Sequence, residues 1–314
     1  TMPVTGLMST YSADRLITDS AAAGTAIATG YKTDNGMISQ LPDGREPITL
    51  LEAARDQGKA TGLVATSTIT HATPASFAAH HYKRSDELAI ASDMAMAGVD
   101  VIFGGGWNQW LPLPEGDRED GRNLFAEMEA NGYTVVRTAE EVINASATPI
   151  IGLIREDALL ENKDEPTVAD LTAKAINLLS ADDDGFFLLV EGSQIDWEAH
   201  ANEEDELVRR ALLFDMAVAE ALEFAEEDGG TLVIVTADHE TGGMTLTKGN
   251  RDGSDVIAQF TSTYHTASPV IVFAYGPGAV DYTGMYENSD LAVKIATSMN
   301  LEHFMAERAN SVER

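Results

Sequence analysis

Short, nearly continuous apolar runs alternate along the chain with segments of helical periodicity. Five runs bounded by Gly, Asp or Thr predict β-strands at residues 62–67, 101–103, 186–190, 231–235 and 269–273. Apolar positions recur at helical spacing in six segments, at residues 48–57, 86–97, 123–130, 167–179, 206–226 and 290–299. Because these strands have no polar face, they predict a largely parallel sheet that helices cover on both sides. The expected fold class is doubly wound α/β.

The length and composition fit one large globular domain. With 314 residues, 44% of them hydrophobic, the chain can bury a sizeable core. It has no Pro/Gly/Ser-rich linker, internal repeat or low-complexity segment that would separate two domains. Residues 1–314 are therefore expected to form a single domain. No apolar run reaches the length of about 18 residues that a membrane span needs, so no span is expected.

The chain is strongly acidic. Its 51 acidic residues outnumber its 20 basic residues, which gives a net charge of -31. Such a surface repels nucleic acids and anionic membranes, so neither is an expected partner. Few lysines and many alanines accompany this charge, a composition similar to that of proteins from salt-loving organisms, and an ordinary acidic surface is the alternative. Cysteine is absent, which excludes disulfides.

A candidate metal site follows the predicted strand at residues 231–235. That apolar run leads into the sequence TADHETGG at residues 236–243, which places Asp238 and His239 after the strand. In open α/β sheets, ligands bind in the crevice outside the carboxyl ends of the strands. An adjacent carboxylate and imidazole there suit zinc. A polar turn after a buried strand is the alternative.

A second acidic group follows the predicted strand at residues 186–190. Glu191 comes directly after five apolar residues, where a carboxylate is costly to bury without a cation or a donor, so a metal ligand is favoured. Asp196 and His200 are four residues apart, and a helix that opens at Asp196 places both on one face, where they can hold one ion. For this pair the alternative is a capping aspartate with an exposed histidine one turn later.

A third candidate is Ser20, in the segment ITDSAAAGTA at residues 17–26. Small residues follow it, and the pattern predicts a helix that begins at Asp19 or Ser20. Unpaired N–H groups and the positive end of the helix dipole gather at such a start, where a serine can contact an anion. No G-x-S-x-G elbow surrounds Ser20, which favours a metal ion over a histidine triad as its activator. Taken alone, Ser20 is better interpreted as a plain N-cap.

Five sequence blocks, in this order, resemble the alkaline phosphatase family. They are TDSAA at residues 18–22, HATPAS at 71–76, EGSQID at 191–196 followed by His200, TADH at 236–239 and HT at 265–266. The segment FAYGPG at residues 273–278 extends the similarity toward the C-terminus. Each block alone is a weak signal, but chance does not readily produce five in order. The resemblance implies an alkaline phosphatase-like fold and a metal-dependent phosphomonoesterase.

The resemblance also implies a role for individual residues. It implies two zinc ions and one magnesium ion with these ligands: Asp196, His200 and His265 for the first zinc; Asp238, His239 and the Ser20 Oγ for the second; Thr73 and Glu191 for magnesium. Ser20 is then the nucleophile, which forms a phosphoserine that water hydrolyses. Arg84 stands where the family places its phosphate-binding arginine, at the end of the helical stretch after Pro74, and a positive helix end is the alternative. A guanidinium matches two phosphate oxygens, which a lysine cannot do.

The other histidines have weaker assignments. His71 lies near the magnesium site in the family pattern, where it acts through a water molecule or only packs. His80, His81 and His303 have no motif context, so we expect them to be structural.

The chain departs from the family pattern before Ser20. The family has an acidic residue in an Asp-Gly motif at the end of its first strand, which bridges the second zinc and the magnesium. Asp14 is a poor substitute, because residues 11–13 before it do not form a buried strand. We therefore expect the native protein to carry an upstream strand and helix that end in the bridging Asp. Without that Asp, the first zinc site is complete and should bind most tightly.

The sequence leaves three functions open. The first is a phosphomonoester hydrolase, the second a phosphodiesterase or sulfatase of the same superfamily, and the third a truncated, non-catalytic metal-binding form. Arg84 favours the first function, because the paired N–H donors of its guanidinium suit a dianionic terminal phosphate. The expected partners are small phosphate monoesters and inorganic phosphate, and a homodimer stays open. The resemblance implies a periplasmic or secreted location, although no signal peptide is present in this chain.

Overall fold

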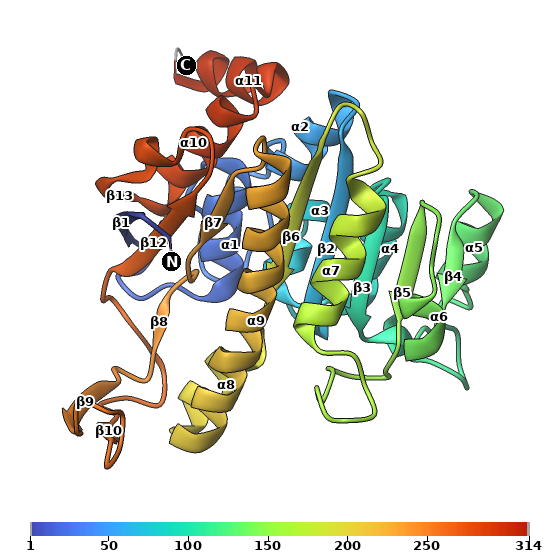
Figure 1. The fold of residues 1–314 in the computed structure, drawn as a ribbon. Helices are drawn as coiled ribbons and strands as arrows, with labels where there is room; N and C mark the ends of the chain where they lie inside the picture. The colour runs from blue at the N-terminus through green and yellow to red at the C-terminus, as the bar shows by residue number, and fades with distance from the viewer. Residues whose placement is uncertain (1, 313–314) are drawn as a thin grey trace.

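The computed structural model describes residues 2–312, and its central feature is a five-stranded sheet. The strands lie in the order β4 (Thr134–Val136), β5 (Ile150–Leu153), β3 (Val101–Gly105), β2 (Ala60–Thr68) and β6 (Phe186–Glu191). Every neighbouring pair runs parallel. Figure 1 shows helices in front of this sheet and behind it. The predicted doubly wound α/β fold class is confirmed.

Alternate residues of β2 enter two hydrophobic cores on opposite faces of the sheet. Leu63 and Ala65 belong to the core that α2, α3 and α4 cover, whereas Val64 belongs to the core that α7 covers. These helices are α2 (Leu50–Asp56), α3 (Ala72–Ala78), α4 (Glu87–Met96) and α7 (Val168–Leu179). Since successive strand side chains point to opposite faces, a continuous apolar strand needs helices on both.

A second sheet of four strands lies beside the first. Its order is β13 (Gly284–Glu287), β1 (Val4–Ser9), β12 (Val270–Tyr275) and β7 (Val233–Val235). β12 runs antiparallel to both of its neighbours, and β1 runs parallel to β13. The expectation that every predicted strand is buried on both faces is wrong for β12. Its Val270 and Val272 are buried but Ile271 is 47% exposed, because helices cover only one face there.

Helices and short strands complete the chain. The helices are α1 (Ser20–Thr29), α5 (Leu124–Ala130), α6 (Ala139–Ile143), α8 (Gln194–Ala201), α9 (Glu204–Asp228), α10 (Asn288–Ser298) and α11 (Glu302–Val312), with 3₁₀ turns η1 (Trp107–Trp110) and η2 (Ala279–Tyr282). Two antiparallel pairs follow β7: β8 (Glu240–Thr241) with β11 (His265–Thr266), and β9 (Thr245–Lys248) with β10 (Ile257–Gln259). Figure 1 shows the β9–β10 hairpin projecting from the body. Among residues 2–312, no helix is long and apolar enough to cross a membrane.

Each predicted element corresponds to an observed one. The five predicted strands are β2, β3, β6, β7 and β12, the six segments of helical periodicity are α2, α4, α5, α7, α9 and α10, and the helix predicted to begin at Asp19 or Ser20 is α1. The sequence did not predict β1, β4, β5, β8 to β11 or β13. β1 was not predicted because exposed and buried residues alternate along it, so it has no continuous apolar run.

Candidate functional site

Three predicted ligands converge between α8 and β11. Asp196 lies in the first turn of α8 and His200 one turn later, with 3.5 Å between the Asp196 Oδ2 and the His200 Nε2. The Nε2 of His265 lies 3.6 Å from the Asp196 Oδ1 and 3.0 Å from the His200 Nε2. The structure thus brings together the residues assigned to the first zinc. Asp196 is not the helix cap of the alternative interpretation, because Ser193 holds the N-cap position.

Hydrogen bonds fix the protons on two of these imidazoles. The His200 Nδ1 donates to the carbonyl of Thr263 at 2.8 Å, and the His265 Nδ1 donates to the carbonyl of Thr18 at 2.7 Å. Each neutral ring then has a lone pair on Nε2. Burial and the neighbouring His239 lower the pKa of His265, which favours its neutral form. Two lone pairs that face each other at 3.0 Å repel, so a cation is the natural complement of this arrangement.

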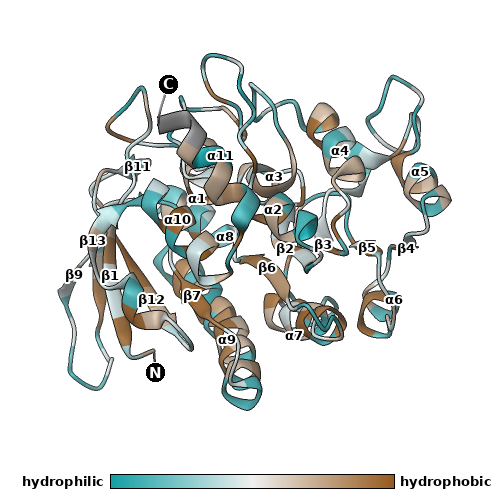
Figure 2. Cartoon of the chain, turned by 90° about the horizontal axis from the view of Figure 1, so that it is seen from above, coloured by the Kyte–Doolittle hydropathy of each residue, from teal (hydrophilic) through white to brown (hydrophobic). Residues whose placement is uncertain are grey.

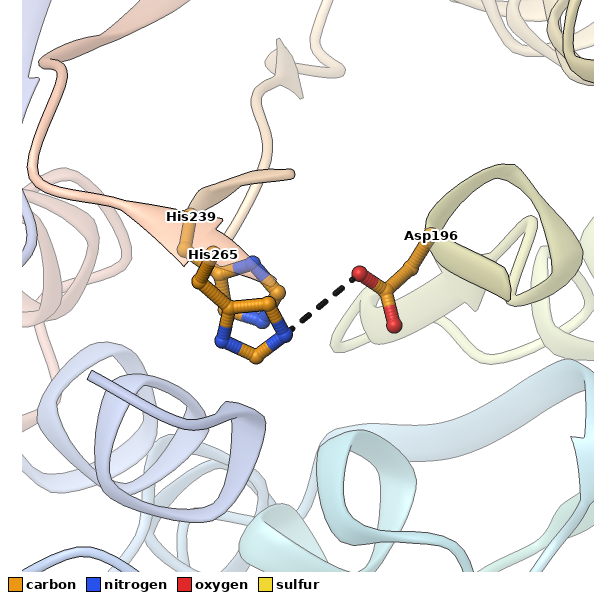
Figure 3. A group of neighbouring side chains, drawn as sticks. All are labelled: Asp196, His239 and His265. Atoms are coloured by element: carbon orange, nitrogen blue, oxygen red, sulfur yellow. Dashed lines mark ion pairs between the residues drawn. The ribbon is translucent and has the colours of Figure 1, made fainter. Parts of the chain in front are cut away.

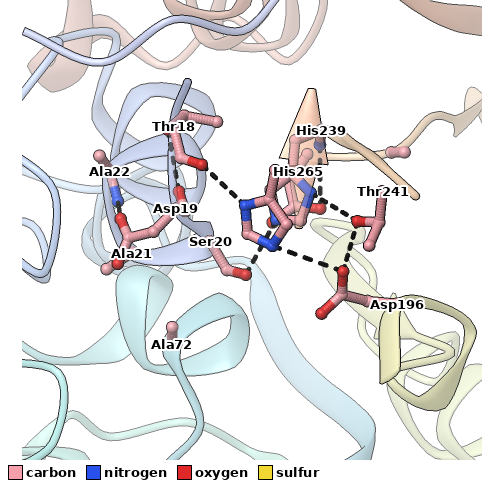
Figure 4. Close-up of polar contacts among 12 residues, drawn as sticks. Thr18, Asp19, Ser20, Ala21, Ala22, Ala72, Asp196, His239, Thr241 and His265 are labelled. Atoms are coloured by element: carbon pink, nitrogen blue, oxygen red, sulfur yellow. Dashed lines mark hydrogen bonds and ion pairs between the residues drawn. The ribbon is translucent and has the colours of Figure 1, made fainter. Parts of the chain in front are cut away.

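A second group forms where the chain leaves β7. The Nε2 of His239 lies 3.1 Å from the Asp238 Oδ2 and 3.0 Å from the Ser20 Oγ, and Figure 4 shows the Ser20 hydroxyl pointing at this ring. In a Ser-His-Asp triad, the acid and the serine bind opposite nitrogens of the imidazole. Here both oxygens meet the same nitrogen. This convergence argues against a triad and for a shared metal ion.

The charge of Asp238 supports the same interpretation. Burial raises the pKa of this carboxyl, but His239 and His265 outweigh burial and hold the pKa at about 2. Asp238 is therefore a carboxylate at neutral pH, which is the form that binds a cation.

The two predicted zinc sites adjoin each other. Asp196, His239 and His265 each offer one ligand atom, and these three atoms lie within 4.8 Å of one another (Figure 3). The rings of His239 and His265 stack with their centroids 3.5 Å apart. Because this group combines residues assigned to different zinc ions, the two sites are immediate neighbours.

Ser20 begins helix α1 but does not cap it. The N-cap is Asp19, whose Oδ1 accepts a hydrogen bond from the backbone N–H of Ala22 at 3.0 Å. The Ser20 side chain is 6% exposed and faces His239. The interpretation of Ser20 as a plain N-cap is therefore wrong, because Asp19 satisfies the helix end and leaves the serine hydroxyl to the site.

The residues assigned to magnesium also lie together. Glu191 ends β6, and the hydroxyls of Ser193 and Thr73 hydrogen-bond to its carboxylate. Burial, together with the negative charges of Asp238 and Asp196, raises the pKa of Glu191 to about 7 despite these bonds. A carboxylate whose ionised form is this unfavourable gains stability from a bound cation.

Arg84 faces the start of helix α1. Its Nη1 lies 3.1 Å from the Asp19 Oδ2, and its Nη2 lies 3.2 Å from the His71 Nε2. The sequence placed Arg84 at the end of a helical stretch, which is wrong because α3 ends at Ala78 and Arg84 lies in the loop before α4. The loop position also removes the alternative of a positive helix end. Two of its five N–H donors orient the guanidinium, and the rest are left for an anion.

His71 supports Arg84 from a half-buried position. Burial and the Arg84 charge lower the pKa of His71 to about 4, so the ring is neutral and its Nε2 can accept from the guanidinium. The same ring makes an edge contact with Trp197 at a centroid distance of 5.9 Å. His71 thus positions Arg84, a role that the sequence left open.

Sequence reasoning missed two further residues of the site. Asp19 joins the N-cap of α1 to Arg84, and the Thr241 hydroxyl lies between Asp196 and the Nδ1 of His239. The available signal for Asp19 was an aspartate directly before a predicted helix. Asp14, the weak candidate for the bridging acid, bonds to Ser12, Arg15 and the backbone of Asn35, and no contact joins it to the ligands described above.

Sequence comparison shows which known proteins this chain is similar to. The family model of alkaline phosphatase matches residues 1–259. Alkaline phosphatase 3 of Bacillus subtilis is 42% identical over 253 residues, which cover 77% of this chain and 53% of the relative. Alkaline phosphatase 4 of the same organism is 35% identical over 368 residues, which cover 92% of this chain and 78% of the relative. The chain thus spans about half the length of the first relative and over three quarters of the second.

Solved structures give the same picture. The alkaline phosphatase from the Antarctic bacterium TAB5 superposes with a TM-score of 0.88 at 37% identity, over 96% of this chain and 89% of that one. A mutant of the TAB5 enzyme, with magnesium bound in its M3 site, has a TM-score of 0.86 at 36% identity, over 95% of this chain and 89% of that one. The Thermus thermophilus alkaline phosphatase has a TM-score of 0.87 at 26% identity, over 95% and 83%.

Proposed function

Because this chain belongs to the alkaline phosphatase family, we propose that it is a metal-dependent phosphomonoester hydrolase that works through a phosphoserine on Ser20. The membership agrees with the resemblance of the five sequence blocks. The products are inorganic phosphate and an alcohol, and the substrates are small phosphate monoesters. The observation that carries the proposal is the meeting of the Ser20 Oγ and the Asp238 carboxylate at one nitrogen of His239.

The donor atoms fit two zinc ions and one magnesium ion. Asp196, His200 and His265 would hold the first zinc through two imidazole nitrogens and a carboxylate, and Asp238, His239 and the Ser20 hydroxyl would hold the second. Thr73 and Glu191 offer magnesium the hard oxygen ligands that it prefers. When bound, such ions lower the pKa of a coordinated hydroxyl and offset the negative charge of phosphoryl transfer.

The side chains of the chain supply the rest of the mechanism. The Ser20 hydroxyl loses its proton and its Oγ attacks phosphorus. The bond from phosphorus to the alcohol oxygen breaks as the new bond forms, and the alcohol leaves after it takes up a proton. Arg84, oriented by Asp19 and His71, binds two non-bridging phosphate oxygens and fixes the phosphoryl group beside Ser20. Water then attacks the phosphoserine, which releases inorganic phosphate and restores the hydroxyl.

A panel of three nitrophenyl esters tests the proposal. We expect rapid release of nitrophenol from p-nitrophenyl phosphate and slow release from bis-p-nitrophenyl phosphate and p-nitrophenyl sulfate, because Arg84 suits a dianionic terminal phosphate. Zinc and magnesium are counted by elemental analysis of the same sample. Faster turnover of the diester or the sulfate would identify the corresponding alternative enzyme. Bound zinc without any turnover would identify the non-catalytic form.

Two further proposals, about location and assembly, rest on the resemblance. We propose a periplasmic or secreted location, which cell fractionation of the producing organism can check. A homodimer is the assembly to test, by light scattering of the purified chain. The net charge of -31 supports the absence of nucleic-acid partners.

A further inference from the structure

The turn that leads into helix α1 connects three parts of the site. Ser20 begins α1 and points its hydroxyl into the site, and the Asp19 carboxylate orients Arg84. The Thr18 carbonyl accepts the hydrogen bond from the Nδ1 of His265, as Figure 4 shows. A shift of this turn would therefore move the serine hydroxyl, the partner of the arginine and the partner of the histidine together.

Packing fixes helix α1 but not the segment before it. The helix lies beside α3 and α10 (Figure 2), and nine of its ten residues are buried. In contrast, residues 10–19 between β1 and α1 form neither a helix nor a strand, and residues 13–16 are exposed. Because no helix or sheet pairs the backbone groups of this segment, the turn at residues 17–20 depends on hydrogen bonds from elsewhere in the chain.

The side chain of Asn35 supplies those hydrogen bonds. Its Oδ1 accepts from the Asp19 backbone N–H at 3.1 Å, and its Nδ2 donates to the Ile17 carbonyl at 3.1 Å. One amide thus holds the turn on both sides of Thr18. The following residue adds a third bond, from the Gly36 N–H to the Asp19 Oδ1 at 3.1 Å. An asparagine suits this position because its amide has both a donor and an acceptor, whereas an ionised aspartate has only acceptors.

The segment that carries Asn35 is also joined to the segment that carries Arg84. Three backbone hydrogen bonds connect residues 36–38 to the arginine segment, among them one of 2.7 Å from the Arg84 N–H to a carbonyl of residues 36–38. At its other end, the guanidinium of Arg84 contacts Asp19, whose backbone N–H Asn35 holds. The backbone and the guanidinium of Arg84 are therefore both connected to Asn35.

We propose that Asn35 is a positioning residue of the site. Its amide fixes the turn at residues 17–20 relative to Arg84, so that the Ser20 hydroxyl and the guanidinium keep one separation. The phosphoryl group of a substrate contacts both of these groups, so its binding depends on that separation. The inference rests on the proposed function, because phosphate is the ligand that Ser20 and Arg84 share.

Two substitutions of Asn35 in the metal-loaded chain test this role. Asn35→Ala removes both amide hydrogen bonds, and Asn35→Asp keeps the shape and the acceptor but removes the donor. We expect each to raise the inhibition constant of inorganic phosphate and the KM of p-nitrophenyl phosphate several-fold, and Asn35→Ala by about tenfold. Neither constant depends on the fraction of the protein that is folded. A merely structural role lowers only that fraction, and with it kcat, and leaves both constants unchanged.

Asn131→Ala is the matched control. Asn131 also precedes a glycine with a positive φ, 92° at Gly132 compared with 91° at Gly36, but it is exposed at the end of α5. We expect this variant to keep the inhibition constant and the KM of the original chain.

Hydrogen exchange gives a second measurement that needs no turnover. We expect the backbone N–H groups of Asp19, Gly36 and Arg84 to exchange faster in both Asn35 variants than in the original chain, and at the original rate in the control. If the original chain hydrolyses no phosphate ester, the proposed function fails, and hydrogen exchange alone decides on Asn35. If Asn35→Ala does not fold, Asn35→Asp decides.

Either of two results overturns the inference about Asn35. The first is an unchanged inhibition constant of phosphate in every Asn35 variant that folds, whatever its kcat. The second is hydrogen exchange at the three backbone groups that is no faster in those variants than in the original chain.

Discussion

At the residue scale, the neighbouring residues Asp19 and Ser20 make different contacts in the site. Asp19 caps helix α1 with one carboxylate oxygen and holds Arg84 with the other. Ser20 is thereby left free to face His239. Two adjacent polar residues thus have different roles, because Ser20 faces the site whereas Asp19 caps the helix and orients Arg84.

Replacement of Ser20 and replacement of Asp19 should differ in their effect on stability. Ser20→Ala should lower kcat/KM for p-nitrophenyl phosphate by orders of magnitude, because the proposed nucleophile is lost, while the Tm hardly changes. Asp19→Ala should destabilise the fold by about 1 kcal/mol, because the N-cap is lost. Steady-state kinetics and urea unfolding of both variants provide the measurement. A Ser20→Ala protein with near-normal turnover and reduced stability would assign the cap to Ser20 after all.

Arg84 can be tested by a substitution that keeps its charge. Arg84→Lys retains the positive charge but would lose the proposed bidentate contact with phosphate, so the inhibition constant of inorganic phosphate should rise about tenfold, or ~1.4 kcal/mol. Arg84→Ala should weaken inhibition further. Competitive inhibition assays measure both. The matched control is Arg137→Lys, because Arg137 packs on Trp107 and follows β4, which lies at the opposite end of the five-stranded sheet from β6. Equal inhibition of the Arg84→Lys and original proteins would remove Arg84 from phosphate binding.

Local sequence strings predicted only part of the site. Asp238, His239, Glu191, Asp196 and His200 stand directly after apolar strands or at helical spacing, so elementary patterns point to them. The remaining assigned residues, Thr73, Arg84 and His265, came from the family resemblance, because no local pattern marks them. The contact of Asp19 with Arg84 spans 65 positions and the one of Thr241 with Asp196 spans 45, which no spacing rule reaches.

At the scale of elements, continuous apolar runs were the reliable signal. β2, β3 and β6 are such runs, because helices cover both faces of the parallel sheet. β1 and β13 belong to the sheet with an exposed face, where the apolar signal is diluted. β4 and β8 are three and two residues long, too short for periodicity to show.

The bond between His80 and Glu52 predicts a pH dependence of stability. Burial lowers the pKa of His80, but the hydrogen bond and charge of Glu52 outweigh burial and raise the pKa above 6.5. A raised folded pKa means that the contribution is fully present below pH 6.5 and is lost as the pH climbs through the folded value. Glu52→Gln, which keeps the amide acceptor for the Thr49 N–H, should lower the unfolding free energy by about 1 kcal/mol at pH 5.5.

Urea unfolding of both proteins from pH 5.5 to 8.5 checks this dependence. The difference between the original chain and Glu52→Gln should shrink toward the alkaline end of the series. A difference that stays constant, or grows with pH, would show that His80 is not protonated in the fold.

At the scale of the whole molecule, the net charge of -31 governs the response to salt. Self-repulsion of the excess carboxylates destabilises the compact state, and the Debye length falls from about 10 Å at 0.1 M salt to about 3 Å at 1 M. The Tm should therefore climb between low and molar NaCl. KCl at equal ionic strength should give the same rise, because screening does not depend on the cation. A Tm that stays constant or falls as salt is added would show that the acidic residues are an ordinary solvated surface and do not destabilise the fold.

The most direct measurement of the central claim is to trap the covalent intermediate on the metal-loaded chain. Turnover of p-nitrophenyl phosphate is quenched with acid, and peptide mass spectrometry then identifies any phosphorylated residue. We predict one phosphoryl group on the peptide that contains Ser20, and none on the same peptide from Ser20→Ala. Steady hydrolysis without phosphate on Ser20, or with phosphate on another residue, would contradict the account.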